Sequence, residues 1–152
     1  MVAPIGTLEP QKTLAVNLQF TRGRHGAAAR IELHDRPAGR FAVLSLMGWV
    51  DLPAERRIEQ TLDDLAARGV AQLLVDCSQL RHIDYRLVPS LVDALGRFES
   101  RAGAYALCGF SHYLRDLFRL AGCDAHLRCW PAPADGAPPA PLPIGPRCES
   151  AS

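Results

Sequence analysis

The chain has 152 residues, of which 48% are hydrophobic and 22% are charged, and its formal net charge is +1. This composition is typical of one globular domain, and the near-neutral charge gives no electrostatic reason to expect a nucleic acid or an anionic membrane as partner. No apolar run approaches the roughly 18 residues of a membrane-spanning helix, and no signal peptide is visible, so we expect a cytoplasmic protein without membrane insertion.

The first predicted elements are strands. Residues 14–20, L-A-V-N-L-Q-F, alternate apolar and polar side chains and are compatible with one extra strand in an N-terminal extension. Two further strands are predicted at 29–34 and 40–48. The turn-forming R-P-A-G at 36–39 lies between them, so the sequence predicts a hairpin.

Helical spacing begins after the hairpin. An amphipathic helix is predicted over 51–69, followed by a continuous apolar strand over 70–77 and a second helix over 86–100. Pro89 restrains Val88 from helical geometry, so we expect this second helix to begin late or irregularly.

The last part of the chain predicts a strand, a helix and a tail. Residues 104–110 form a buried strand, Ser111 is an N-cap, and a third helix covers 112–122. A short edge strand is predicted at 125–130. Residues 131–152 hold seven of the twelve prolines, which predicts a disordered or extended tail.

The order β-β-α-β-α-β-α-β predicts a single α/β domain with a mixed sheet flanked by helices. Buried strands joined through helices need parallel pairing, while the initial hairpin is antiparallel. We therefore divide the chain into an N-terminal extension (1–27), a central domain (28–130) and a proline-rich tail (131–152).

Signatures of enzymes are absent from the sequence. It has no phosphate-binding glycine loop, no complete G-x-S-x-G elbow and no H-E-x-x-H zinc motif. The odd number of cysteines, without C-x-x-C spacing, argues against a disulfide framework and favours buried thiols. They are Cys77, Cys108, Cys123, Cys129 and Cys148.

A few residues leave chemical alternatives open. Cys77 and His82 are a weak candidate for a nucleophile and its base. Asp76 and Asp84 could face one crevice at the carboxyl ends of strands, or simply serve a turn and a helix start. Two carboxylates do not define a metal site, so we predict no catalytic, cofactor-binding or metal-binding residues.

Four segments, in this order, resemble a known family. They are L-M-G-W-V-D (46–51), L-L-V-D-C-S-Q-L-R-H-I-D (73–84), A-L-C-G-F-S (106–111) and L-A-G-C (120–123). Together they resemble the STAS domain of bacterial anti-sigma-factor antagonists, over roughly residues 29–130. The resemblance implies a mixed sheet of four to five strands flanked by helices, and a switchable, non-enzymatic protein-binding module without a cofactor.

The resemblance also implies a site at the corner after Asp84. In the family a Ser or Thr follows this aspartate and is phosphorylated by a partner anti-sigma kinase. Here Tyr85 occupies the phosphoacceptor position, Arg86 follows it, and Leu87 stands where glycine is usual. Arg86 cannot imitate phosphate because its charge has the opposite sign.

The resemblance therefore predicts a module that binds an anti-sigma factor or a related serine-kinase-like protein without the usual Ser/Thr phospho-switch. Tyr and Arg are frequent interface anchors, although both side chains could also simply project into solvent. Ser78 could instead stabilise a loop, and Ser90 falls within the predicted helix. The predicted partner-binding residues are Ser78, Asp84, Tyr85, Arg86, Leu87 and Ser90.

Other functions and assemblies remain open at this point. A homodimer is compatible with such a module. The same family includes accessory subunits of lipid-transport ABC complexes and components of signalling scaffolds. A domain that binds a small ligand or a nucleotide in the crevice at the carboxyl ends of the strands is the second class.

Overall fold

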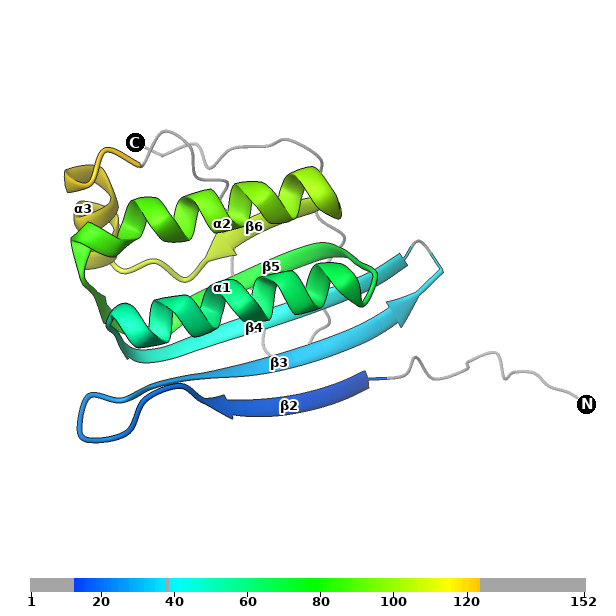
Figure 1. The fold of residues 1–152 in the computed structure, drawn as a ribbon, viewed down its shortest axis with the longest axis horizontal. Helices are drawn as coiled ribbons and strands as arrows, with labels where there is room; N and C mark the ends of the chain where they lie inside the picture. Colours follow the sequence, from blue (N-terminus) through cyan, green and yellow to red (C-terminus); the bar gives the residue numbers. More distant parts are fainter. Residues whose placement is uncertain (1–12, 38, 124–152) are drawn as a thin grey trace, which may run out of the picture.

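The computed structural model of the protein describes residues 13–37 and 39–123. Within these residues the chain forms five strands, three α-helices and one short 3₁₀-helix, labelled as in Figure 1. The strands are β2 (Thr13–Gln19), β3 (Ala27–Arg36), β4 (Gly39–Val50), β5 (Val70–Ile83) and β6 (Ala104–Cys108). The helices are α1 (Leu52–Ala67), η1 (Tyr85–Leu87), α2 (Val88–Arg101) and α3 (His112–Leu120).

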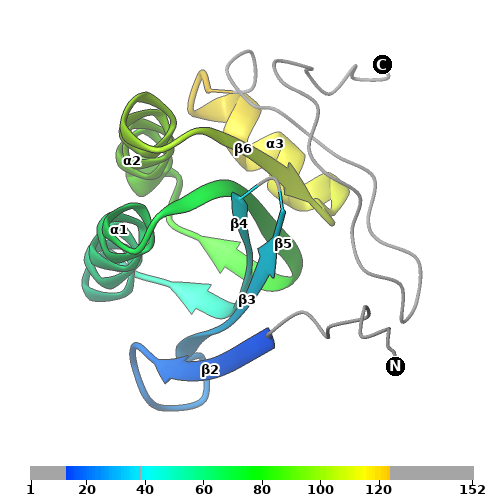
Figure 2. The same cartoon turned by 90° about the vertical axis from the view of Figure 1, so that its right-hand side faces the viewer.

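The strands form one mixed sheet in the order β2-β3-β4-β5-β6. The pairs β2–β3 and β3–β4 are antiparallel, whereas β4–β5 and β5–β6 are parallel. Figure 2 shows α1 and α2 side by side on one face of the sheet, with α3 on the other side of β6. The predicted α/β class and mixed sheet are therefore confirmed, and the strand compatible with residues 14–20 is present as β2.

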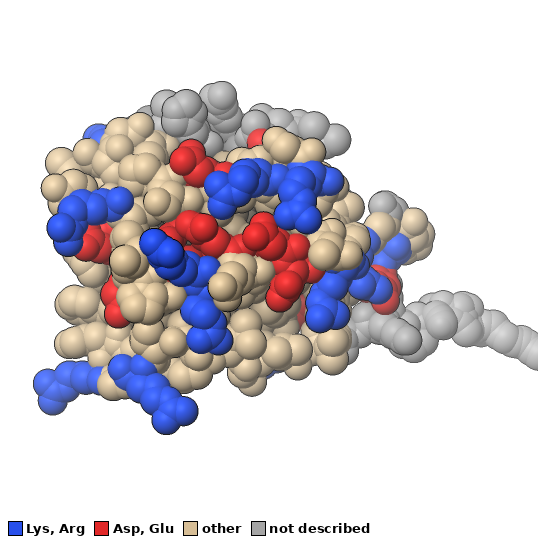
Figure 3. Space-filling model, in the orientation of Figure 1, with Lys and Arg blue, Asp and Glu red and all other residues tan. Residues whose placement is uncertain are grey.

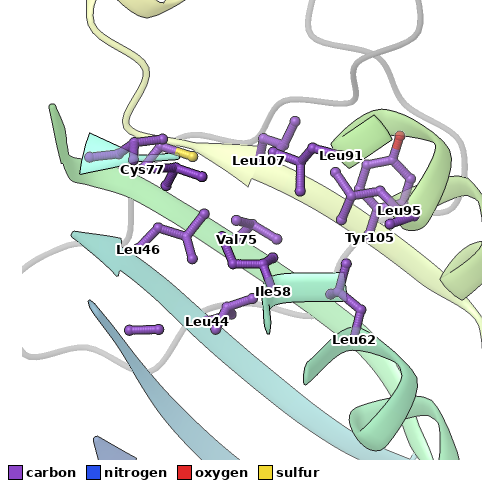
Figure 4. Close-up of a cluster of buried hydrophobic side chains, with 14 of the residues drawn as sticks. Leu44, Leu46, Ile58, Leu62, Val75, Cys77, Leu91, Leu95, Tyr105 and Leu107 are labelled. Atoms are coloured by element: carbon purple, nitrogen blue, oxygen red, sulfur yellow. The ribbon is translucent and has the colours of Figure 1, made fainter. Parts of the chain in front are cut away.

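The core lies between the sheet and the apolar stripes of α1 and α2. Ile58 and Leu62 of α1, and Leu95 of α2, are almost fully buried, as their helical spacing predicts. Figure 4 shows them with Leu44 and Val75 on the facing side of the sheet. Burial of these side chains supplies most of the free energy that holds the two helices on the sheet.

Charged side chains connect α1 and α2 on the outer surface. Figure 3 shows a band of acidic side chains between these helices, with basic side chains on either side. Glu59 of α1 lies 3.5 Å from Arg97 of α2, and Asp63 lies 3.2 Å from Arg101. Because these pairs are largely exposed, each contributes less than about 1 kcal/mol to stability.

Side-chain caps begin two of the helices, and the one at Ser111 was predicted from the sequence. The side chain of Asp51 accepts a hydrogen bond from the backbone N–H of Ala54 at 3.1 Å, just before α1. The Ser111 hydroxyl likewise accepts from the Leu114 N–H at 3.1 Å and begins α3. Ser111 is therefore an N-cap. The segment G-F-S-H-Y that contains Ser111 connects β6 to α3.

The β5 strand is longer than the sequence indicates. We expected it over 70–77, but it continues to Ile83 because the end of β4 pairs with it in parallel, Trp49 opposite His82 and Val50 opposite Ile83. Among residues 78–82 only Leu80 is apolar, so the apolar run that identifies a buried strand is interrupted and the extension has little sequence signal. Ser78 thus lies on a strand rather than in a loop.

The second helix begins irregularly, as expected from Pro89. The η1 turn comes first and α2 starts at Val88. Val88 itself has helical backbone angles, φ −60° and ψ −43°, so the expected restraint on this residue is wrong. Proline lies in the first turn of α2, where its missing N–H costs no hydrogen bond, and the fully buried Val88 side chain fixes the turn.

Several predictions fall on residues that the structure does not describe. They are the edge strand at 125–130, the tail at 131–152 and residues 1–12 of the N-terminal extension. The domain boundaries at 27/28 and 130/131 therefore stay predictions. None of the helices in the described part of the chain is long and apolar enough to cross a membrane.

Candidate functional site

The corner between β5 and α2 is closed by a pairing of Asp84 with Arg86. The Asp84 carboxylate accepts a hydrogen bond from the backbone N–H of Arg86 at 3.0 Å. The guanidinium of Arg86 donates to both carboxylate oxygens, from Nε at 3.1 Å and from Nη2 at 2.7 Å. These hydrogen bonds from the side chain and the backbone of Arg86 lower the pKa of Asp84 to about 2. The corner therefore holds an ionised carboxylate whose charge is neutralised locally.

Beside this corner, four aromatic rings form a row, which we call the ring row: His25, Trp49, His82 and Tyr113. The Trp49 ring lies between two histidines, 4.2 Å from His25 and 4.8 Å from His82 between ring centroids. His82 Nδ1 and the Tyr113 hydroxyl share a hydrogen bond of 2.5 Å. The row thus links the β2–β3 loop, the ends of β4 and β5, and the start of α3.

The backbone explains why Trp49 reaches this position. The parallel ends of β4 and β5 meet at one edge of the sheet, with a register irregularity between Gly48 and Trp49. Gly48 has φ of 86°, and a Cβ on it would collide with the carbonyl oxygen of Gly26. Only glycine suits this position, since it combines a positive φ with close approach of the β2–β3 loop.

A cavity of about 550 Å³ opens at this edge. Its volume falls in the range of sites that bind small molecules, about 300–1,000 Å³. It combines aromatic and aliphatic walls with one ion pair. The residues that line the cavity include His25, Trp49, Leu52, His82, Asp84 and Arg86.

Exposed apolar side chains gather around the cavity. Among the described residues seven large hydrophobic side chains are exposed, and four of them lie at this edge, each 41–49% exposed. They come from β4, α1, η1 and α3: Trp49, Leu52, Tyr85 and Tyr113. Such a concentration of exposed apolar area is typical of a surface that contacts another molecule.

The structure brings together only some of the predicted partner-binding residues. Asp84, Arg86 and Leu87 border the cavity, and Tyr85 lies on the same turn with its side chain exposed. Leu87 also packs against the core, so it supports the turn from below.

The two serines lie elsewhere. Ser78 is on β5, where its N–H donates to the Asp76 carboxylate at 2.9 Å, and Gly109 packs closely against it. Ser90 is exposed on α2 and faces a separate groove that contains Glu55 and Glu59 of α1. Neither serine lines the cavity, and of the two aspartates only Asp84 lines it.

None of the cysteines in the described part of the chain is exposed enough to act as a nucleophile. Cys77, Cys108 and Cys123 are buried and form no disulfide, as expected for the first two from their apolar runs. Burial, together with the charge of Asp76, raises the pKa of Cys108 to about 12, so this residue is a thiol at neutral pH. Cys77 is buried in the main core cluster, away from solvent. Across residues 13–37 and 39–123, no group of three or more His, Cys, Asp or Glu side chains is arranged to hold a metal ion.

Sequence reasoning missed the ring row. Trp49 had a usable signal, because it stands at the carboxyl end of a strand beside the strand that leads to Asp84. His82 and Tyr113 follow the strands predicted from the sequence at 70–77 and 104–110 in the same way. His25 lies in a hairpin loop, and nothing in its sequence context indicates that this loop reaches the carboxyl edge of the parallel strands.

The sequence matches the model of one known family. A family model described as Mlab, STAS domain matches residues 33–128, more than half of the chain. The chain belongs to the STAS domain family. No curated protein gives a significant match to this STAS domain.

Solved structures support the same fold. The anti-sigma factor antagonist SpoIIAA in its unphosphorylated form shares 23% identity with a TM-score of 0.52, covering 62% of this chain and 82% of that one. An anti-sigma factor antagonist from Mycobacterium paratuberculosis shares 16% identity with a TM-score of 0.55, covering 72% and 90%. The protein TM1081, solved by NMR, shares 15% identity with a TM-score of 0.54, covering 60% and 74%. At these identities the likeness concerns the fold of the STAS domain.

Proposed function

We propose that this STAS domain is a non-enzymatic module that binds a regulatory protein, an anti-sigma factor or related kinase-like protein, without the Ser/Thr phospho-switch of its family. The proposed contact surface is the η1 corner together with the ring row. The two anti-sigma factor antagonists of similar fold support this class of partner.

One observation carries the proposal: the four exposed apolar side chains at the carboxyl edge of the parallel strands. Aromatic side chains and arginine contribute most of the binding free energy in many interfaces, because they bury large areas with few rotatable bonds. Tyr85, Arg86 and Trp49 supply these residue types on neighbouring elements. A partner that covers them removes apolar surface from water and meets a locally neutral ion pair.

The chemistry of the corner favours binding over catalysis. A general base works best with a pKa near the operating pH. Asp84 is far from this condition, since Arg86 holds its pKa at about 2 and occupies both of its oxygens. The carboxylate therefore serves to fix the turn that presents Tyr85.

The loss of the phospho-switch follows from the side chain at position 85. A Ser/Thr kinase finds a phenol where the family has a small hydroxyl residue, and the adjacent guanidinium is already paired with Asp84. We expect Tyr85 to stay unmodified when the chain is incubated with a cognate serine kinase and ATP. Mass spectrometry that finds stoichiometric phosphate on Ser78 or Ser90 instead would show that the switch has moved.

Binding measurements test the proposed surface. Capture on the immobilised chain, followed by mass spectrometry, should recover a kinase-like regulator, whose affinity is then measured by calorimetry. Replacing Tyr85→Ala together with Arg86→Ala, or Trp49→Ala alone, should weaken binding by about 30-fold, the effect of losing about 2 kcal/mol of contact. Leu120→Ala is the matched control, because Leu120 is exposed on the last turn of α3. Unchanged affinity in both site variants would exclude this surface.

A second candidate is an accessory subunit of a lipid-transport ABC complex. The matching family model is described as Mlab, STAS domain. The STAS family includes accessory subunits of such complexes, and this supports the second candidate. In that case the same capture should recover an ATPase subunit and no kinase-like protein. The ring-row variants should then weaken that complex.

The cavity itself supports a third candidate, the binding of a small ligand. Its volume of about 550 Å³ could accommodate a nucleotide or a lipid headgroup. A thermal-shift screen with these compounds should then raise the melting temperature of the wild-type chain, and Trp49→Ala should abolish the shift. No shift with any compound would exclude this function.

A further inference from the structure

Strand β2 forms an open edge of the sheet. Figures 1 and 2 show β3 on one side of β2, and among the described elements no strand lies on its other side. An edge strand presents backbone N–H and C=O groups that can pair with another strand.

The sequence of β2 contains none of the usual features that prevent such pairing. Its seven residues, T-L-A-V-N-L-Q, include no charged residue and no proline. Its register with β3 is continuous from Thr13 opposite His34 to Gln19 opposite Ala28, without a bulge. Edge strands of monomeric proteins are commonly protected by charge, proline or a bulge.

An exposed apolar row runs along this strand. Leu14, Val16 and Leu18 alternate with smaller or polar residues and point to one face, where Leu14 is 56% and Val16 is 38% exposed while Leu18 packs partly against the core. They line a groove of about 250 Å³ with Leu33 of β3 and Leu65 of α1. Helix α1 lies over the middle of the sheet, as Figure 2 shows, so none of the described helices covers the outer side of the row.

We propose that β2 is the interface with a second copy of this chain. In this arrangement the two β2 strands pair antiparallel about a two-fold axis and join the two sheets into one. With Val16 on the axis, Leu14 of one copy is opposite Leu18 of the other. Directly opposed residues of antiparallel strands share a face, so the apolar rows of the two copies meet.

The uncharged, partly apolar β2 strand is better suited to pair with a second copy of itself than with a charged or strongly polar segment. In the same register Ala15 is opposite Asn17 and Thr13 is opposite Gln19, so no like charges are placed together. The groove beside the row carries one acid and one base, Asp64 and Arg68 of α1. Because this rim carries charges of both signs, it does not repel the same rim on a second copy of the chain. An interface with two-fold symmetry requires this.

The size of the contact sets the expected affinity. Specific stable interfaces bury about 1,600 Å² in total, and seven paired residues at an edge bury considerably less. The dimer should therefore be weak, with a dissociation constant on the order of 10–100 μM, and should dissociate on dilution.

Analytical ultracentrifugation of the full chain tests the proposal. Between about 1 μM and about 1 mM the average mass should rise from that of one chain toward that of two, since weak dimers form in this range. Leu14→Lys and Val16→Lys each place a charge on the edge and should raise the dissociation constant at least tenfold. Leu120→Lys, which alters a more exposed leucine (69%) on α3, should dimerise like the wild type. Circular dichroism and thermal unfolding verify that each variant is folded.

Each other outcome would overturn the proposal. A wild-type chain that stays monomeric at the highest concentration excludes the dimer. Dimers that persist unchanged in both β2 variants show that a different face is used. A monomeric chain that binds a foreign protein through β2 assigns the edge to another partner.

Discussion

The buried carboxyl group of Glu55 should make the stability of this domain fall as pH rises. Glu55 lies on α1, its side chain is only 1% exposed, and its Oε2 atom has no hydrogen-bond partner. Burial, with the hydrogen bond and the charge of Glu59 as smaller causes, raises the pKa of Glu55 to about 8. The charges of Arg56 and Arg97 act in the opposite direction but do not compensate.

The sign and size of the effect follow from proton linkage. In the unfolded chain the pKa of Glu55 is about 4.5, so between pH 4.5 and 8 the folded state keeps a proton that the unfolded state releases. Stability should therefore fall through this window by as much as about 1.4 kcal/mol for each pH unit. Below the window Glu55 has no effect, and above it the full penalty is on the order of 5 kcal/mol, a large part of the stability of a small domain.

Urea unfolding of the wild type and of Glu55→Gln, from about pH 5 to about pH 8.5, measures how the free energy of unfolding changes with pH. The wild-type slope is compared with the limit of about 1.4 kcal/mol for each pH unit. Glutamine keeps the shape and cannot ionise, so the variant should equal or exceed the wild type, with an advantage that grows with pH. Glu32→Gln is the control, because Glu32 is a partly exposed carboxyl on β3 that pairs with Arg30 at 3.1 Å, and it should follow the wild-type slope. Parallel pH profiles for the wild type and Glu55→Gln would refute the reasoning.

Three further predictions concern the core and the corner. Phe98→Ala should lower the free energy of unfolding by about 3–5 kcal/mol in urea titrations, since the side chain is almost fully buried. Gly109→Ala should destabilise more than Gly69→Ala, because both have positive φ, but only at Gly109 would a Cβ collide with neighbouring backbone, 2.7 Å from a backbone nitrogen; thermal unfolding compares the two. Arg86→Ala should return the pKa of Asp84 from about 2 toward 3.8, measured by NMR titration of the carboxyl carbon, and an unchanged value would contradict the assigned cause.

Much of the fold was predictable because local patterns and tertiary packing agree. The stripe containing Ile58 and Leu62, the cap at Ser111 and the apolar run of β5 each correspond to an observed element. The end of β5 was not predictable in the same way. Residues 78–82 are polar except for Leu80, and their strand geometry comes from pairing with the end of β4, a contact that a local window cannot contain.

The candidate site was predictable only in part, for a related reason. The family pattern points to Asp84 and the residues that follow it, which are contiguous in the chain. The ring row is assembled from four segments, and Trp49 meets His82 only through the register of two parallel strands. The reach of His25 depends on the geometry of the β2–β3 loop, which no periodic pattern encodes.

That loop also determines whether the two proposed contacts depend on one another. It joins β2, the proposed dimer edge, to β3 and carries His25 of the ring row. Within a single chain the loop is already fixed: Phe20 is buried, and its N–H donates to the carbonyl of Ala27 at 2.9 Å. The Thr21 hydroxyl accepts a hydrogen bond from the Ala27 N–H at 2.8 Å. Because these bonds hold His25 in place without a second copy, loss of the dimer should leave the ring row intact, and the two contacts should be energetically independent.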